Sequence, residues 1–409
     1  MAAETSTDAL VATGVRTYVP NYAPKPVVFD HGEGARLWDI DGREYIDLGT
    51  GISVNSFGHR HPDLIAAVTG QAGRLFHTSN LYYVEPTVRL AEDLVDGTFA
   101  ERVFFCNSGA EANEAAIKIA RRRAAEAGRG PEEREIITFE GSFHGRTLAT
   151  VTATAQPKYH EGFEPMPGGF TYCPFNDPEA LEAAISDRTC AVMLEPVQGE
   201  GGVTPSRQGF LRHVQDLCRR HDSLLVLDEI QSGMGRTGKF FAYEWEPGIE
   251  PDVVTMAKAL AGGLPMGAVL AGARAADALT VGTHGSTFGG NPVSAAAARV
   301  AVGLARSDNL LANVVRQGDA FRLFLNRINA ELGLFRDVRG KGLMIGAELG
   351  EAHEGKAGAL VDACQEEGVI VLVAGPSVLR LLPPLNIGDE DVRHATAGME
   401  RAFRAFAAS

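Results

Sequence analysis

The sequence has few cysteines, and they do not form the pairs that bind metals or build disulfide frameworks. The five are odd in number, scattered and without a Cys-x-x-Cys spacing: Cys106, Cys173, Cys190, Cys218 and Cys364. This pattern disfavours a disulfide-rich secreted domain and a cysteine zinc site, and it fits reduced thiols in the cytosol. We therefore expect a cytoplasmic protein without a metal site.

Long apolar runs and an excess of positive charge are also missing. No stretch is apolar over the roughly 20 residues that a membrane helix needs, and the acidic, polar start of the chain does not resemble a signal peptide. The formal net charge is -14 at pH 7. Nucleic acids and anionic membranes bind clustered Lys and Arg, so we expect neither as a partner.

The apolar pattern predicts a large α/β domain and a smaller one. A chain of 409 residues, 45% of them hydrophobic, can form two or three structural lobes. Continuous apolar runs alternate with helical patterns, as in a mostly parallel sheet covered by helices on both faces; the runs are 103–106, 135–139, 191–194, 224–227 and 253–254. We predict an arm with part of the small domain at 1–61, the large domain at 62–306, and an α+β small domain at 307–409.

Local signals refine this division. Helical patterns cover 111–125 and 209–221, and Asp41-Gly42 predicts a hairpin within 35–48. The opening through Pro26 has the composition of a loosely ordered arm. In the large domain a ligand site is expected where the parallel strands end.

One lysine stands apart in a chain that is poor in lysine. Lys258 follows the apolar run 251–257 and precedes small residues through Gly263. A lysine withdrawn from water is easier to deprotonate, and its neutral amine can attack a carbonyl to form a Schiff base. Taken alone, the same pattern also describes a lysine whose stem packs while its charge reaches solvent.

Two more features stand at predicted strand ends. Ser108, Gly109 and Ala110 open a helix, where free backbone N–H groups favour an anion such as a phosphate, although an ordinary serine cap explains them equally well. Asp228 ends a buried strand and needs a cation or several donors. It precedes Lys258 by about one strand-helix-strand unit, so both can reach one crevice. Binding of pyridoxal phosphate requires a lysine, a carboxylate and an anion-binding helix start, and the sequence has all three.

Neighbouring loops carry candidates for substrate contacts. Phe143 and Arg146 follow the strand at 135–139, where an aromatic ring can stack on a flat cofactor and an arginine can bind a carboxylate. Arg380 is a single cation in an apolar run, and Glu200, on a glycine-rich turn, is its acidic candidate. A structural salt bridge is the alternative for each arginine.

Two motifs suggest other chemistries. The segment 233–238 matches G-x-G-x-x-G, which is typical of dinucleotide sites, but a polar segment separates it from the preceding strand and no clear helix follows. His59 and His61 flank an arginine without a further ligand at suitable spacing, so a structural loop is preferred to a metal site. A nicotinamide oxidoreductase and a non-catalytic binding protein remain as alternatives.

With these residues in place, the sequence closely resembles the class III aminotransferases of pyridoxal-phosphate fold type I, the ornithine and γ-aminobutyrate type. The resemblance covers nearly the whole chain, and its most specific segments are 105–116, 227–238 and 282–291. It implies the fold of that class, pyridoxal 5'-phosphate as cofactor, and a homodimer with shared active sites.

The resemblance also implies a role for each candidate residue. Lys258 would be the Schiff-base lysine, Asp228 the partner of the pyridine nitrogen and Gln231 the contact of the ring hydroxyl. The other implied cofactor contacts are Ser108, Gly109 and Ala110 at the phosphate, Phe143 on the ring, Glu229 and Ile230 beside it, and Thr287, whose counterpart reaches the phosphate of the neighbouring subunit. The implied substrate contacts are Arg146 with Ser286 nearby, and Arg380, which is freed for the glutamate α-carboxylate when Glu200 swings away.

Within the class, the sequence is most similar to the acetylornithine type. Ornithine δ-aminotransferases carry a tyrosine where this chain has Ile52, so we expect transfer of the δ-amino group of N2-acetyl-L-ornithine, rather than of ornithine, to 2-oxoglutarate. The products would be N-acetyl-L-glutamate 5-semialdehyde and L-glutamate, a step of arginine biosynthesis. γ-Aminobutyrate, succinylornithine and N-succinyl-diaminopimelate remain alternative donors.

Overall fold

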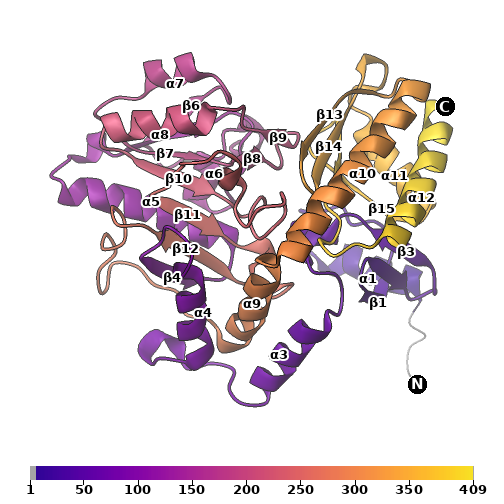
Figure 1. Ribbon diagram of the computed structural model, residues 1–409, viewed down its shortest axis with the longest axis horizontal. Coiled ribbons are helices and arrows are strands. Elements are labelled where there is room, and N and C mark those ends of the chain that lie inside the picture. The colour runs from indigo at the N-terminus through magenta and orange to yellow at the C-terminus, as the bar shows by residue number, and fades with distance from the viewer. Residues whose placement is uncertain (1–5, 409) are drawn as a thin grey trace.

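The computed structural model describes residues 6–408 and contains a large and a small lobe (Figure 1). The large lobe is built on a seven-stranded sheet in the order β4-β12-β11-β10-β7-β5-β6. Its strands are β4 (Arg102–Cys106), β5 (Glu135–Phe139), β6 (Phe170–Cys173), β7 (Thr189–Leu194), β10 (Leu224–Asp228), β11 (Val253–Met256) and β12 (Gly267–Ala271). Only β12 runs antiparallel to its neighbours within this sheet, so the predicted mostly parallel sheet is confirmed.

Both faces of this sheet are covered because its strands are apolar on both sides. In β10, Leu224 and Val226 belong to the core on the α5 face, whereas Leu225 and Leu227 belong to the core on the α8 face. The helices of the lobe are α3 (Pro62–Ala72), α4 (Glu85–Val95), α5 (Gly109–Glu126), α6 (Leu148–Ala153), α7 (Pro178–Ala184), α8 (Phe210–Arg220) and α9 (Pro292–Ala305). The predicted helices at 111–125 and 209–221 are α5 and α8.

Two four-stranded sheets form the small lobe, on the right of Figure 1. One has the order β1-β2-β3-β15 and the other β13-β14-β17-β16. Their strands are β1 (Phe29–Glu33), β2 (Arg36–Asp39), β3 (Glu44–Asp47), β13 (Phe335–Lys341), β14 (Met344–Leu349), β15 (Val369–Ile370), β16 (Leu372–Val373) and β17 (Val378–Leu381). The helices α10 (Asp308–Leu332), α11 (Ala357–Glu366) and α12 (Asp389–Ala407) complete it. The predicted hairpin is the β2–β3 pair.

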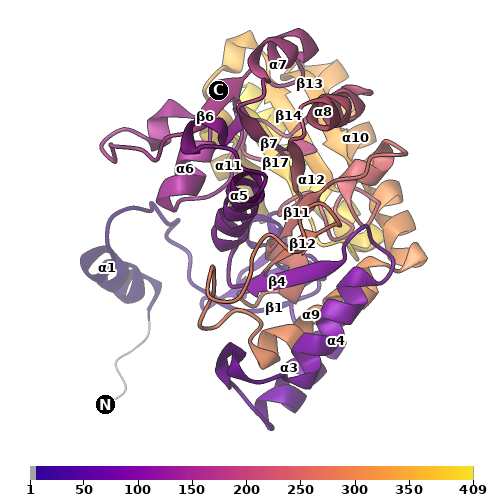
Figure 2. The same cartoon turned by 90° about the vertical axis from the view of Figure 1, so that its left-hand side faces the viewer.

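The opening through Pro26 contains a helix, and its residues 1–5 lie outside the described residues. Residues Thr7–Thr17 form helix α1, which Figure 2 shows apart from the body of the molecule. Ser6 caps it by accepting a hydrogen bond from the Ala9 N–H at 3.3 Å, and Asp8 lies in its first turn. None of its residues is buried. The prediction of a loosely ordered opening is therefore wrong for these residues, because local capping forms a helix without a core.

A left-handed turn follows the hairpin. All four residues of Thr50–Ser53 have positive φ, including 64° at Ile52, which non-glycine residues adopt only at a cost. Two hydrogen bonds hold the first residue of the turn: Asp47 Oδ1 accepts the Thr50 N–H at 2.8 Å, and Thr50 Oγ1 donates to the Leu382 carbonyl at 2.8 Å. The second bond joins it to the chain just beyond β17.

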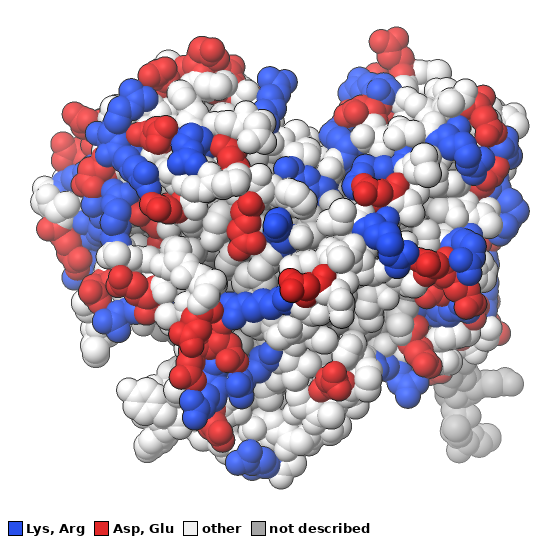
Figure 3. All heavy atoms as spheres, viewed as in Figure 1, with Lys and Arg blue, Asp and Glu red and all other residues white. Residues whose placement is uncertain are grey.

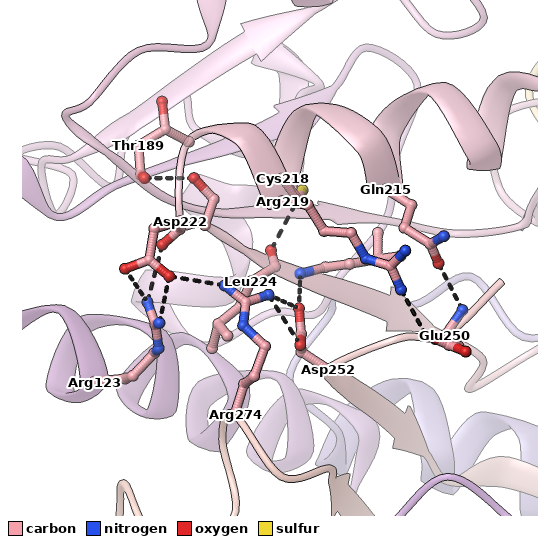
Figure 4. Close-up of polar contacts among 12 residues, drawn as sticks. Arg123, Thr189, Gln215, Cys218, Arg219, Asp222, Leu224, Glu250, Asp252 and Arg274 are labelled. Atoms are coloured by element: carbon pink, nitrogen blue, oxygen red, sulfur yellow. Dashed lines mark hydrogen bonds and ion pairs between the residues drawn. The ribbon is translucent and has the colours of Figure 1, made fainter.

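A charged network occupies the amino-terminal edge of the large sheet (Figure 4). Arg274 bridges Asp252, at 2.9 Å, and Asp222, at 3.0 Å, while Arg123 also pairs with Asp222. Asp252 in turn accepts the Leu225 N–H at 2.8 Å, so the network ties loops to the start of β10. Each of these arginines is therefore paired with a carboxylate.

Acidic and basic side chains are interspersed over the face shown in Figure 3. The view shows no continuous basic patch of the kind that binds nucleic acid. Within residues 6–408, no helix is long and apolar enough to span a membrane.

Candidate active site

A cavity of about 420 Å³ opens where β4, β5, β7, β10 and β11 end, within the usual range for a small-molecule site. Loops after these parallel strands converge there because their carboxyl ends share one edge. Its walls include the predicted residues Ser108, Gly109, Ala110, Phe143, Arg146, Asp228, Ile230, Gln231 and Lys258.

Lys258 enters this cavity one residue beyond the end of β11, after Ala257. It begins the short helix η5 (Lys258–Ala261) and has φ of 44°, a left-handed conformation that is uncommon outside glycine. Burial lowers the pKa of its amine, and the carboxylates of Glu200 and Asp228 only partly oppose that shift. The geometry therefore presents an amine that loses its proton more readily than a solvated lysine.

Asp228 is held by three donors. Its Oδ2 accepts from Asn113 Nδ2 at 2.7 Å and lies 2.8 Å from His144 Nδ1, while Oδ1 accepts the Ile230 N–H at 3.1 Å. These bonds fix a carboxylate that is only 3% exposed. The carboxylate is thereby held in one orientation on the cavity wall, where it can meet a protonated heterocyclic nitrogen.

The start of α5 forms the opposite wall. Ser108 caps the helix by accepting the Glu111 N–H at 3.2 Å, so the serine-cap interpretation is correct. The N–H groups of Gly109 and Ala110 remain without intrahelical partners because they lie in the first turn. A Cβ at Gly109 would stand 2.8 Å from Ile230 Cδ1, so glycine allows the helix to approach the loop after β10. A capped helix start beside the cavity suits a phosphate.

Arg380 of β17 lies behind the cavity and is paired. Its Nη1 donates to Glu200 Oε1 at 2.5 Å, and to the Gly199 carbonyl and Gln231 Oε1 at 3.2 Å each. Burial raises the pKa of Glu200, but the Arg380 guanidinium outweighs this, so the carboxyl pKa lies below its ordinary value. Arg380 is therefore closed off by a carboxylate that an incoming carboxylate could replace.

Arg146 is an exposed arginine on the cavity wall. Its guanidinium carbon lies 4.0 Å from the centre of the Tyr159 ring and 5.4 Å from that of Phe143. In residues 6–408 it has no carboxylate partner, unlike Arg380, so the salt-bridge alternative does not apply to it.

Besides Arg380 and Glu200, three predicted site residues do not line this cavity. Glu229 turns away and accepts from Ser232 Oγ at 2.6 Å and the Tyr243 N–H at 2.9 Å. Ser286 lies beside the helix start, where its Oγ accepts from Asn107 Nδ2 at 3.1 Å. Thr287 lines a second cavity of about 320 Å³.

Three residues of the site had no role in the sequence analysis. Asn113 and His144 hold Asp228, and each keeps a buried side-chain atom without a partner, Asn113 Oδ1 and His144 Nε2. Glu195 accepts the Phe143 N–H at 2.9 Å, and burial raises its pKa to about 7. The signal that could have found Asn113 is an amide on the inner, alanine-rich face of α5.

The two motifs that suggested other chemistries have structural roles. In the segment 233–238, the buried Arg236 donates to the Leu343 carbonyl and to Ser56 Oγ, which joins the two lobes. His59 Nε2 lies 2.8 Å from Asp47 Oδ2. Among the described residues, no group of three or more His, Cys, Asp or Glu could hold a metal ion.

A family model described as Aminotransferase class-III matches residues 17–403. The chain belongs to this family. Within class III, it is 55% identical over 393 residues to the acetylornithine aminotransferase of Xanthomonas campestris pv. campestris, covering 96% of both chains. It is 50% identical to a protein of Pseudomonas aeruginosa named succinylornithine transaminase/acetylornithine aminotransferase, covering 95% of each.

Solved class III structures share this architecture. The N-acetylornithine aminotransferase of Stenotrophomonas maltophilia superimposes with a TM-score of 0.86 at 48% identity, over 97% of this chain and 99% of the other. The ornithine aminotransferase of Toxoplasma gondii, whose active site holds pyridoxal phosphate at partial occupancy, gives 0.94 at 35% identity, over 98% and 96%. The predicted fold class is confirmed.

Proposed function

We propose that this class III aminotransferase moves the δ-amino group of N2-acetyl-L-ornithine to 2-oxoglutarate, a step of arginine biosynthesis. The observation that carries the proposal is the cavity in which Lys258 faces Asp228 and the start of α5, with one free and one paired arginine nearby. The names of the similar proteins support the choice of donor.

The cavity residues fit pyridoxal 5'-phosphate. Asp228, fixed by Asn113 and His144, suits the pyridinium nitrogen, and the N–H groups of Gly109 and Ala110 suit the phosphate. Phe143 and Gln231 line the space between them. When bound, this cofactor supplies a carbonyl carbon that holds the amino group and a ring that withdraws electrons.

Three side chains of the protein then have separate roles in the reaction. Burial lowers the pKa of Lys258, so its neutral amine would take the proton from the substrate carbon and return it. Arg146 binds the α-carboxylate of the amine donor, near Ser286. Arg380 binds the α-carboxylate of glutamate or 2-oxoglutarate after Glu200 moves aside. The same site therefore accepts two substrates in turn.

The experiment is the visible spectrum of the purified protein with pyridoxal phosphate. We expect an absorption band that acetylornithine bleaches, and that Lys258→Ala lacks while still binding the cofactor. Lys341→Ala is the matched control, because burial lowers the pKa of Lys341 too but it lies near Trp245, away from the cavity. A protein that pyridoxal phosphate cannot colour would refute the proposal.

Succinylornithine is the second candidate for the amine donor, because the similar protein of Pseudomonas aeruginosa is named for both activities. Bleaching rates with acetylornithine, succinylornithine and γ-aminobutyrate decide between donors. Negligible turnover of acetylornithine would overturn our choice.

We also propose a homodimer in which Thr287 reaches the phosphate of the neighbouring subunit. Exposed aromatic side chains beside the second cavity support this, since Tyr82 and Tyr83 are 73% and 97% exposed. Sedimentation that gives a monomer would contradict it.

A cytoplasmic location goes with this function, and the five unpaired, buried cysteines fit it.

The division into 1–61, 62–306 and 307–409 is likewise a proposal. It is supported by the strands of the large sheet, which all fall between Arg102 and Ala271.

A further inference from the structure

The substrate arginine on the cavity wall has an unusual environment. In residues 6–408, no carboxylate and no hydrogen-bond acceptor contacts the Arg146 guanidinium, and the side chain is exposed. A long, unrestrained side chain loses many rotamers when it binds a ligand, which weakens binding. Something other than an ion pair must therefore restrain it if it is to bind a carboxylate well.

An aromatic platform supplies this restraint. The Arg146 guanidinium carbon lies 4.0 Å from the Tyr159 ring centre, within the range of a cation–π contact. Tyr159 meets Phe143 edge to face, with ring centres 6.0 Å apart and planes at 83°. Stacking on a ring face leaves the N–H edge of a guanidinium free, and that edge is the one that binds a carboxylate in a forked manner.

The platform is itself fixed to the loop that carries Arg146. Tyr159 ends the short helix η3 (Pro157–Tyr159), and its N–H donates to the Gln156 carbonyl at 3.0 Å. Gln156 Nε2 donates to the Ser142 carbonyl at 2.8 Å. On the other side, His160 Nε2 lies 2.8 Å from the Thr154 carbonyl. Tyr159 thus keeps its place relative to the cavity wall.

We propose that Tyr159 is a positioning residue that holds Arg146 ready for the α-carboxylate of the amine donor. The inference rests on the proposed function and adds to it the residue that orients the carboxylate contact. The ring face carries the effect, because the Tyr159 hydroxyl makes no hydrogen bond within residues 6–408. Phenylalanine should therefore replace tyrosine, and an aliphatic residue should not.

The test compares two donors that differ only in the carboxylate. N-Acetylputrescine is acetylornithine without its α-carboxylate. In the holoenzyme, Tyr159→Leu should raise the KM for acetylornithine roughly tenfold with little change in kcat, since it removes uniform binding. The KM for N-acetylputrescine should stay within about twofold, and Tyr159→Phe should resemble the parent protein for both donors.

A second arm is independent of turnover. The probe is N2-acetyl-L-norvaline, which is acetylornithine without its δ-amino group. Its binding to the holoenzyme, measured by calorimetry, should weaken in Tyr159→Leu and not in Tyr159→Phe. In an Arg146→Leu background, Tyr159→Leu should have no further effect, because its action passes through Arg146. If the protein transaminates no amine, the proposed function fails while this arm still reports on Tyr159.

Three results would overturn the inference: an unchanged KM in Tyr159→Leu, an equal loss with N-acetylputrescine, or full additivity with Arg146→Leu. Should Tyr159→Leu not fold, Tyr159→Met removes the ring with a more adaptable side chain and takes its place in every arm.

Discussion

Removing Glu200 should destabilise the protein and, at the same time, improve its binding of dicarboxylates. Glu200→Ala leaves Arg380, which is 3% exposed, with only the Gly199 carbonyl and Gln231 Oε1 as acceptors. Breaking a buried pair from one side costs about 3–5 kcal/mol. The Glu200 side chain is 25% exposed and two acceptors remain, so we expect a smaller loss than for a fully buried pair, about 2–3 kcal/mol.

A dicarboxylate should reverse this loss. In the parent protein it must displace Glu200, whereas in Glu200→Ala it meets an arginine without a partner. Glutarate at a hundred times its Kd stabilises a folded protein by about 2.7 kcal/mol, and at a fixed concentration the variant should gain more than the parent because its Kd is lower.

The assay is urea unfolding of the holoenzyme with and without glutarate. Glu250→Ala is the matched control, because Glu250 pairs with the exposed Arg219 and is itself 74% exposed. Its removal should cost less than about 1 kcal/mol and leave glutarate protection unchanged. A loss below about 1 kcal/mol in Glu200→Ala, or equal protection of variant and parent, would refute the exchange of one carboxylate for another at Arg380.

Two further predictions concern the same site, and a third concerns the adjacent Glu229. Arg146→Ala should impair both half-reactions and Arg380→Ala mainly the one with glutamate; equal losses in rapid-mixing kinetics would contradict the separate roles. His144→Ala should weaken cofactor retention roughly tenfold, measured by loss of colour on dialysis, because Asp228 loses a donor. The pKa of Glu229 is raised to about 7 from 4.5, so its contribution to stability is complete below pH 4.5 and is lost as pH rises through 7, by up to about 3 kcal/mol. Urea unfolding at pH 5 and pH 8 should show a smaller difference for Glu229→Gln, and an unchanged difference would contradict this.

Much of the site can be predicted from the sequence because its reactive side chains lie at the ends of strands. Asp228 directly ends the apolar run of β10, and Lys258 follows β11 after a single further residue, Ala257. Since these strands are parallel neighbours, chain spacing alone brings the two residues together. The capped start of α5 is visible for the same reason, as a Ser-Gly pair after β4.

Other parts were not visible because they depend on contacts between distant segments. The strand β12 (Gly267–Ala271) lies antiparallel between β4 and β11, and its short run of small residues gives little strand signal. Tyr159 stands 13 residues after its partner Arg146, at the end of the short helix η3, and no sequence pattern predicts that the two side chains stack. The direction of Glu229 was also hidden, because the turn after β10 decides which side chain faces the cavity.

The sheet that joins the two ends of the chain has a consequence for biosynthesis. Ile46 of β3 pairs with Val369 of β15, about 320 residues later. At roughly 5–20 residues per second, a ribosome needs on the order of 15 to 65 seconds to deliver that partner. Throughout this interval the β3 edge is an open template for other strands. The nascent protein should therefore depend on chaperones until its last tenth emerges, and stalled or truncated chains should aggregate.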